Sequence, residues 1–168
     1  MIFMINQDEL IIYDFLQSSV VESNYFGKQI VLLSICKMGE DYKNTALTDK
    51  IIGAFYIVYN KLGYGFLEKV YENALIIELK KSGLNVKRQS PVKVYYNGEE
   101  VGSYFADIIV EDLVIVELKA CDGYIDEHVA QLTNYLKASK VEVGLLLNFR
   151  IKAQVKRRVF NNEYKTLQ

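Results

Sequence analysis

The most constraining feature of the sequence is the run LVIVEL at residues 113–118, which is apolar at every position except Glu117. So apolar a strand is expected at the centre of a sheet, buried on both faces. Because side chains alternate along a strand, Glu117 and Lys119 project on the face opposite to Val116. A carboxylate on a core strand is costly unless it is paired or binds a cation. The presence of Glu117 on this strand therefore indicates either a paired charge or a cation-binding site.

The flanking sequence predicts an α/β fold. Apolar residues recur at helical spacing after Thr48, which we expect to be an N-cap, up to Gly63, and again from about Phe66 to Ser82. The period then switches to two. Strands are expected at 86–89, 92–96, 101–110, 113–118, 141–148 and 155–160, with a helix at 126–139. Pro91 marks a bend or an edge, and Asn97-Gly98 a type I′ hairpin turn. The result is an α/β sandwich, a mixed β-sheet flanked by helices.

The chain of 168 residues is expected to hold one such domain, at 45–162, behind an N-terminal extension at 1–40 whose weak periodicity defines no structure. Met38 could be the true start, and N-terminal sequencing or the intact mass of the native protein would test this. Residues 1–13 carry two acidic residues and no Lys or Arg, which is unlike a signal peptide. The apolar stretches are too short to cross a bilayer, which takes ~20 residues. We therefore expect a cytoplasmic protein without membrane contact.

Composition narrows the chemistry of any site. One histidine, His128, and two cysteines without C-x-x-C spacing exclude a disulfide scaffold and a Cys/His zinc site, so a metal would need carboxylates. The net charge of −1 gives no general sign of nucleic acid. Locally, however, residues 137–158 hold seven basic residues and one acidic residue. This segment could neutralise phosphates or could be a solvated edge strand guarded by Lys and Arg.

Asp107 is the second carboxylate in the apolar sheet, and the strand register decides whether it meets Glu117. A two-residue loop at 111–112 places Asp107 opposite Val116, on the wrong face. A three-residue loop at 110–112, with Asp112 in the left-handed region, places Asp107 on the face of Glu117, one diagonal step away. A bulge would also serve. The chemical interpretation thus predicts a three-residue loop or a bulge, whereas the alternative is a surface hairpin with exposed Glu and Lys.

With that register, the two carboxylates would suit Mg²⁺, or Mn²⁺ in its place, since Mg²⁺ favours carboxylates and several waters. Such an ion would polarise a phosphodiester. Lys119 would stabilise a hydroxide or the charge that develops on the phosphate oxygens.

These residues resemble the metal site of the PD-(D/E)XK nuclease superfamily, with Asp107 followed ten residues later by Glu117-x-Lys119. Upstream, residues 65–71 read GFLEKVY, the G-x-x-E-x-x-Y signature of the GxxExxY protein family, a branch with this nuclease-like core. The segments 106–110, 116–120 and 131–136 also match. The resemblance extends from about residue 47 to about residue 160. Ala106 stands where the proline of the motif's name would be.

The resemblance implies a restriction-endonuclease-like core and a role for each matching residue. Asp107 and Glu117 would be metal ligands with the carbonyl of Leu118, and Lys119 would be the catalytic lysine. Glu68 would be an additional acidic residue near the ion, although it also reads as an exposed helix residue. Gln131 could orient Lys119 or reach DNA.

Other residues near these motifs have two interpretations each. Tyr135, one helical turn from Gln131, could also orient Lys119 or reach DNA, but it is expected to pack in the core. His128 could touch the site, but it is expected to lie on the surface. Tyr95, Tyr96 and Tyr104 could stack on bases, although strand tyrosines are commonly just half-buried.

The function expected from the resemblance is a Mg-dependent nuclease of the GxxExxY type that hydrolyses phosphodiesters in DNA. The alternative is a non-catalytic nucleic-acid-binding or protein-interaction module that keeps the nuclease fold. DNA is the expected partner, and a homodimer is compatible with the sequence.

Overall fold

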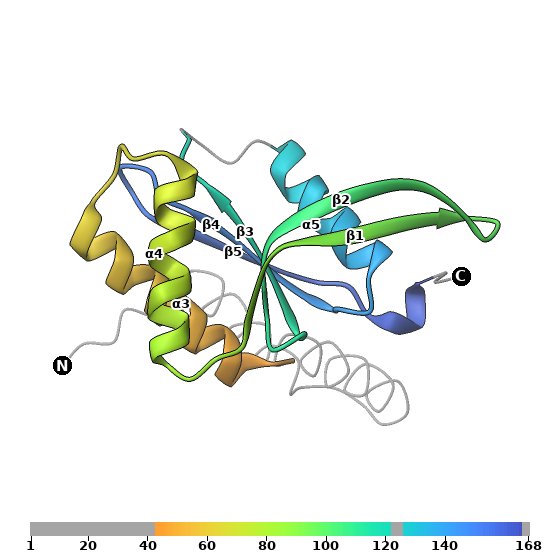
Figure 1. The fold of residues 1–168 in the computed structure, drawn as a ribbon, viewed down its shortest axis with the longest axis horizontal. Helices are drawn as coiled ribbons and strands as arrows, with labels where there is room; N and C mark the ends of the chain where they lie inside the picture. Colours follow the sequence, from red (N-terminus) through yellow and green to blue (C-terminus); the bar gives the residue numbers. More distant parts are fainter. Residues whose placement is uncertain (1–42, 122–125, 166–168) are drawn as a thin grey trace, which may run out of the picture. The chain divides into compact units, whose positions relative to one another are not determined.

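The computed structural model describes residues 43–121 and 126–165 (Figure 1). The extension expected at 1–40 lies outside the described residues, so that hypothesis and the domain boundaries stay predictions. The elements are α3 (Thr45–Leu62), α4 (Glu68–Lys81), β1 (Val86–Tyr96), β2 (Glu99–Val110), β3 (Val114–Lys119), α5 (Asp126–Ala138), β4 (Val143–Asn148), β5 (Gln154–Val159) and the 3₁₀ helix η1 (Asn162–Tyr164). No helix within these ranges is long and apolar enough to span a membrane.

The five strands form one mixed sheet in the order β1-β2-β3-β4-β5, with β3 at its centre as its apolar sequence predicts. Strands β3 and β4 are parallel, and all other neighbours are antiparallel. The fold is thus an α/β sheet flanked by helices, as expected. Pro91 lies within β1, which is one continuous edge strand rather than the two short strands expected; an edge strand tolerates the missing N–H.

Two helix starts differ from the sequence prediction. Helix α3 begins at Thr45, after Asn44 with φ 58°, and Thr48 lies buried inside the helix. The Thr48 hydroxyl donates to the Thr45 carbonyl at 2.9 Å, so it is not the N-cap that we expected. Helix α4 begins at Glu68 rather than Phe66. The Asn97-Gly98 turn is confirmed, with φ values of 51° and 83°.

The sheet is covered on both faces by helices. On one face, α3 and α4 pack against alternate residues of the central strands, among them Val116, Leu118 and Leu145. On the other face, α5 places Leu132, Tyr135 and Leu136 against Ile115 and Leu146. Figure 1 shows α5 apart from the α3–α4 pair. Glu117, which alternates with Val116 and Leu118, therefore belongs to the α5 face.

Gly144 sets how closely α5 approaches the sheet. A Cβ atom at this position would lie 2.7 Å from Cδ1 and 3.0 Å from Cγ of the fully buried Leu132. Such overpacking costs about 1–3 kcal/mol because neither the strand nor the helix can move freely. We predict that Gly144→Ala lowers the free energy of unfolding, measured by urea denaturation, by that amount. Gly102→Ala is the control, since nothing lies within 4 Å of its Cβ position. Equal stability of the two variants would contradict this account.

Candidate active site

The loop between β2 and β3 decides the position of Asp107. The observed pairs are Val110↔Val114 and Ile108↔Val116, which leaves a three-residue loop at 111–113. The predicted loop length is confirmed, but the predicted residues, 110–112, are wrong by one. The loop can form here because both Glu111 and Asp112 adopt positive φ, 53° and 57°. Pairing ends at Ile108↔Val116, so Asp107 and Glu117 come directly beyond the last pair on their two strands, and the diagonal placement stays a prediction.

The left-handed Glu111 is unusual, because only Gly, Asn and Asp visit this region routinely. Its N–H donates to the Asn85 carbonyl at 3.0 Å. Its carboxylate accepts from the Asn85 backbone N–H at 2.7 Å and from the Asn85 side chain at 3.1 Å. These three bonds hold the turn, and the two carboxylate bonds lower the pKa of Glu111. Asn85 therefore fixes the register that the site needs.

Strand β2 leaves β3 at Asp107. Pairing between the two strands ends at Ile108↔Val116, whereas β3 stays paired to β4 up to Lys119. Ala106 belongs to the core under α5, but Ile108 belongs to the core under α3 and α4. Residues two apart in a regular strand share a face, so β2 must twist sharply between them. Gln89, opposite Asp107 in β1, has φ 46°, which locates the same distortion in the neighbouring strand.

The Asp107 carboxylate occupies the gap that this separation opens. Its Oδ2 accepts the Leu118 N–H at 2.9 Å, and its Oδ1 accepts the Gln89 side-chain amide at 3.2 Å. The carboxylate thus replaces the backbone carbonyl that a continued ladder would supply. Because the N–H and C=O of one extended residue point to the same side of a strand, the Leu118 carbonyl also points toward the gap.

Glu117 and Lys119 form a buried ion pair beside Asp107. The Lys119 Nζ donates to Glu117 Oε1 at 2.8 Å. The Lys119 side chain is 13% exposed and the Glu117 side chain 3%. Glu117 Oε2 is buried and accepts no hydrogen bond within the described structure. Burial, followed by the negative charge of Asp107, raises the pKa of Glu117 to about 7. Burial lowers the pKa of Lys119, but the hydrogen bond to Glu117 and the surrounding carboxylates outweigh it, so that this pKa is raised.

Glu68, at the first turn of α4, reaches the end of β3. Its carboxylate accepts the Ala120 N–H at 3.2 Å, and its charge also raises the pKa of Glu117. Glu68 is exposed, so its position agrees with both sequence interpretations. Tyr71 holds the preceding loop: its buried hydroxyl donates to the Gly63 carbonyl at 2.9 Å and accepts the Phe66 N–H at 3.2 Å. The G-x-x-E-x-x-Y segment therefore positions Glu68 at the site.

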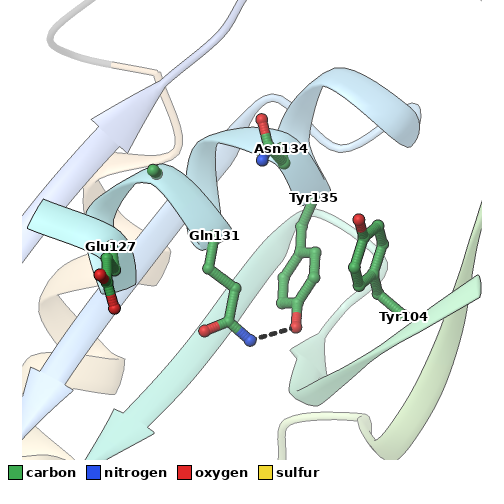
Figure 2. Close-up of a pocket in the computed structure, with 6 residues that line it drawn as sticks. Tyr104, Glu127, Gln131, Asn134 and Tyr135 are labelled. Carbon is green, nitrogen blue, oxygen red and sulfur yellow. Dashed lines mark hydrogen bonds between the residues drawn. The ribbon is translucent and has the colours of Figure 1, made fainter.

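Helix α5 contributes Gln131 and Tyr135 (Figure 2). The Gln131 side-chain amide donates to the Tyr135 hydroxyl. Burial raises the pKa of Tyr135, and the charges of Glu117 and Asp107 raise it further. The Tyr135 hydroxyl also donates to the carbonyl of Phe105, two residues before Asp107, at 3.5 Å, and the Tyr135 ring packs in the core as predicted. No hydrogen bond joins Gln131 to Lys119 among the described residues, so an orienting role is not visible.

Comparison with known proteins now decides the family. The chain matches the sequence model of the PD-(D/E)XK nuclease superfamily over residues 45–159. The chain belongs to the PD-(D/E)XK nuclease superfamily. No curated protein matches it. A solved structure entitled "Crystal structure of SSO0001" is similar at 17% sequence identity with a TM-score of 0.44. The alignment covers 56% of this chain and 50% of that one, so the chain spans about half the length of that protein.

Two residues that support the candidate site were not predicted from the sequence. Gln89 bonds Asp107, and the fully buried Asn148 bonds both backbone groups of Cys121, at 3.0 and 3.3 Å. A polar residue at the end of the apolar strand at 141–148 was a signal for Asn148. Gln89 gave none, because its role depends on its left-handed backbone. The His128 Nε2 atom lies 3.7 Å from the Cys121 sulfur, and no hydrogen bond joins His128 to a carboxylate among the described residues.

The basic segment at 137–158 does not form one surface. Val155 and Val159 pack toward α3 and α4, which places Arg157 between them on that face. Lys156 is opposite Leu146 in the sheet and therefore lies on the α5 face with Glu117. Arg158, two residues on, shares that face. Only part of the segment thus lies on the face of the nuclease-family carboxylates.

The donor atoms fit a hard cation with few protein ligands. Among the described residues, no three Asp, Glu, His or Cys side chains gather as a metal-binding group. Mg²⁺, however, is usually held by one or two carboxylates and keeps several waters. Glu117 Oε2 without a partner, the Asp107 carboxylate and the Leu118 carbonyl aimed at the gap meet that lower requirement.

The raised pKa of Glu117 predicts how stability depends on pH without metal. The folded pKa of about 7 exceeds the ordinary value of 4.5, so the native state holds this proton more tightly than the unfolded chain. The contribution of protonated Glu117 to the stability of the fold is complete below pH 4.5 and is lost as the pH rises through 7. With EDTA, the stability of Glu117→Gln relative to wild type should rise by roughly 2–3 kcal/mol between pH 4.5 and 8.

This difference is measured by urea denaturation across the pH range. Glu99→Gln, which alters an exposed carboxylate at the start of β2, is the matched control and should run parallel to wild type. A Glu117→Gln curve that also runs parallel would show that Glu117 is not an unfavourably buried carboxylate.

Proposed function

We propose that this protein is a Mg²⁺-dependent nuclease that hydrolyses phosphodiesters in DNA, with a site of the GxxExxY type. The observation that carries the proposal is the convergence of Asp107, Glu117 and Lys119 where β2 and β3 separate. Membership of a nuclease superfamily supports the reaction class. Mg²⁺, or Mn²⁺, DNA and the individual residue roles are the further content of the proposal.

Asp107, Glu117 and the Leu118 carbonyl would hold the ion, with Glu68 close by. When bound, Mg²⁺ supplies a Lewis acid that polarises the phosphodiester. Asp107 already accepts the Leu118 N–H, which holds its carboxylate against the end of β3. Glu117 is costly to bury as a lone anion, and an additional cation would remove much of that cost.

Lys119 acts as a cation. The hydrogen bond to Glu117 and the neighbouring carboxylates raise its pKa, so we assign Lys119 the role of an ammonium rather than that of a general base. Its role is therefore to stabilise negative charge that develops on the phosphate oxygens. Its bond to Glu117 restricts its position beforehand. On the same sheet face, Lys156 and Arg158 would neutralise neighbouring phosphates of a bound strand.

The nuclease proposal predicts specific losses of cleavage. Asp107→Asn and Lys119→Ala should each lower the cleavage rate of plasmid and single-stranded DNA by about 10²–10³-fold, since each removes a group that stabilises the reacting phosphate. Activity should require Mg²⁺ or Mn²⁺ and stop in EDTA. Asp112→Asn is the matched control, because this carboxylate on the β2–β3 turn is 66% exposed and forms an ion pair with Lys87, away from the candidate site.

Cleavage that is unchanged in Asp107→Asn and Lys119→Ala would exclude this site. Salt-dependent DNA binding without cleavage would instead favour the non-catalytic binding module. The absence of a third carboxylate or histidine in a metal-binding group of the described residues is the observation that keeps that alternative in the test.

Metal affinity should depend on pH through Glu117. Because a ligand must lose its proton to bind the ion, Mg²⁺ affinity of wild type measured by calorimetry should fall as the pH drops below 7, by up to about tenfold per unit. Glu117→Gln should bind more weakly and show a flatter dependence on pH. An equal slope in both proteins would mean that Glu117 is not a ligand.

A further inference from the structure

A pocket of about 290 Å³ lies along the flank of α5 that faces Tyr104 of β2 (Figure 2). It is lined by Tyr104, Glu127, Ala130, Gln131, Asn134 and Tyr135. Its volume is at the small end of the range for ligand pockets, about 300–1,000 Å³. It therefore suits one flat group rather than a long segment of a partner.

Aromatic surface forms one wall of this pocket. The rings of Tyr104 and Tyr135 are tilted by 49° with centroids 5.6 Å apart. Tyr135 is buried, whereas Tyr104 is 47% exposed and keeps free aromatic surface. The Gln131 side-chain amide donates to the Tyr135 hydroxyl, and this hydrogen bond restricts the position of the Tyr135 ring (Figure 2). A supported, partly exposed ring is a stacking platform for a planar group.

The polar groups of the pocket select the chemistry of that planar group. Gln131 and Asn134 carry amides, which both donate and accept hydrogen bonds, and Glu127 carries an exposed carboxylate. None of the described residues that line the pocket is Lys or Arg. A phosphate would meet only negative charge here. A nucleobase offers a flat face to the ring and amino groups to the carboxylate and the amides.

We propose that this pocket binds one unpaired nucleobase of the substrate strand, next to the phosphate at the Asp107–Glu117 site. This inference rests on the proposed function and adds a substrate class to it, namely single-stranded or locally unpaired nucleic acid. The position supports the link, because Tyr135 lines the pocket and its hydroxyl donates to the carbonyl of Phe105, two residues before Asp107 in β2. A base inside a duplex is stacked on its neighbours and cannot reach the ring of Tyr104.

The test measures stacking independently of cleavage. Oligonucleotides of single-stranded DNA and RNA, each with one 2-aminopurine, are titrated with wild-type protein in EDTA and, in parallel, in Ca²⁺. Stacking on Tyr104 should quench the 2-aminopurine fluorescence. The single strands should bind at least tenfold more tightly than the same sequence annealed to its complement, and the two sugars show which nucleic acid is preferred.

Tyr104→Ala should weaken single-strand binding by about tenfold and abolish the quenching, whereas Tyr104→Phe should keep both. Tyr96→Ala is the matched control, because Tyr96 is 69% exposed at the tip of the same β1–β2 hairpin and lies outside the pocket. Glu127→Gln should reduce the preference for bases that carry an amino group.

The outcomes separate the two proposals. Quenching that depends on Tyr104, without any cleavage by wild type, would sustain the base pocket and remove the nuclease function. Cleavage with unchanged binding and quenching in Tyr104→Ala would overturn the pocket alone. Tighter binding of the duplex, or no binding of any oligonucleotide in either buffer, would also overturn it.

Discussion

The hydrogen bond from the Leu118 N–H to the Asp107 carboxylate is the interaction on which the site depends. A sheet normally pairs this N–H with the next strand, but β2 pairs with β3 only from Ile108 to Val110. A buried N–H without an acceptor would cost about 1–3 kcal/mol, so the side chain that replaces the ladder stabilises the fold. The separation of the strands opens the gap that the Asp107 carboxylate occupies, and Asp107 satisfies the end of β3 there.

Burial then gives Glu117 and Lys119 their chemistry. Each would be unfavourable alone at this depth, and each shifts the pKa of the other toward the charged form. The balance is incomplete for Glu117, since burial and Asp107 outweigh the ammonium and keep its pKa near 7. A site with excess negative charge and one unpartnered carboxylate oxygen is suited to receive a cation.

The order of elements and the central position of β3 could be predicted because they follow from local hydrophobic patterns. The face shared by Asp107 and Glu117 required the correct loop length, and this was predictable because Asp112 tolerates positive φ. The loop residues were not, since the left-handed Glu111 depends on Asn85, 26 residues earlier. The role of Gln89 likewise depends on a contact between strands that no local pattern encodes, whereas Asn148 is marked in the sequence by its polar side chain at the end of an apolar strand.

Helix α5 contributes residues both to the core and to the aromatic pocket. Leu132 packs against Gly144 and thereby fixes the distance of α5 from the sheet. Gln131 and Tyr135 lie on the adjoining turns, so that distance also sets the position of the Tyr135 hydroxyl relative to the carboxylates. Tyr104 reaches the same helix from the part of β2 that has left β3. The separation that exposes Asp107 therefore also brings Tyr104 to α5, and one distortion of the sheet builds both the carboxylate site and the aromatic pocket.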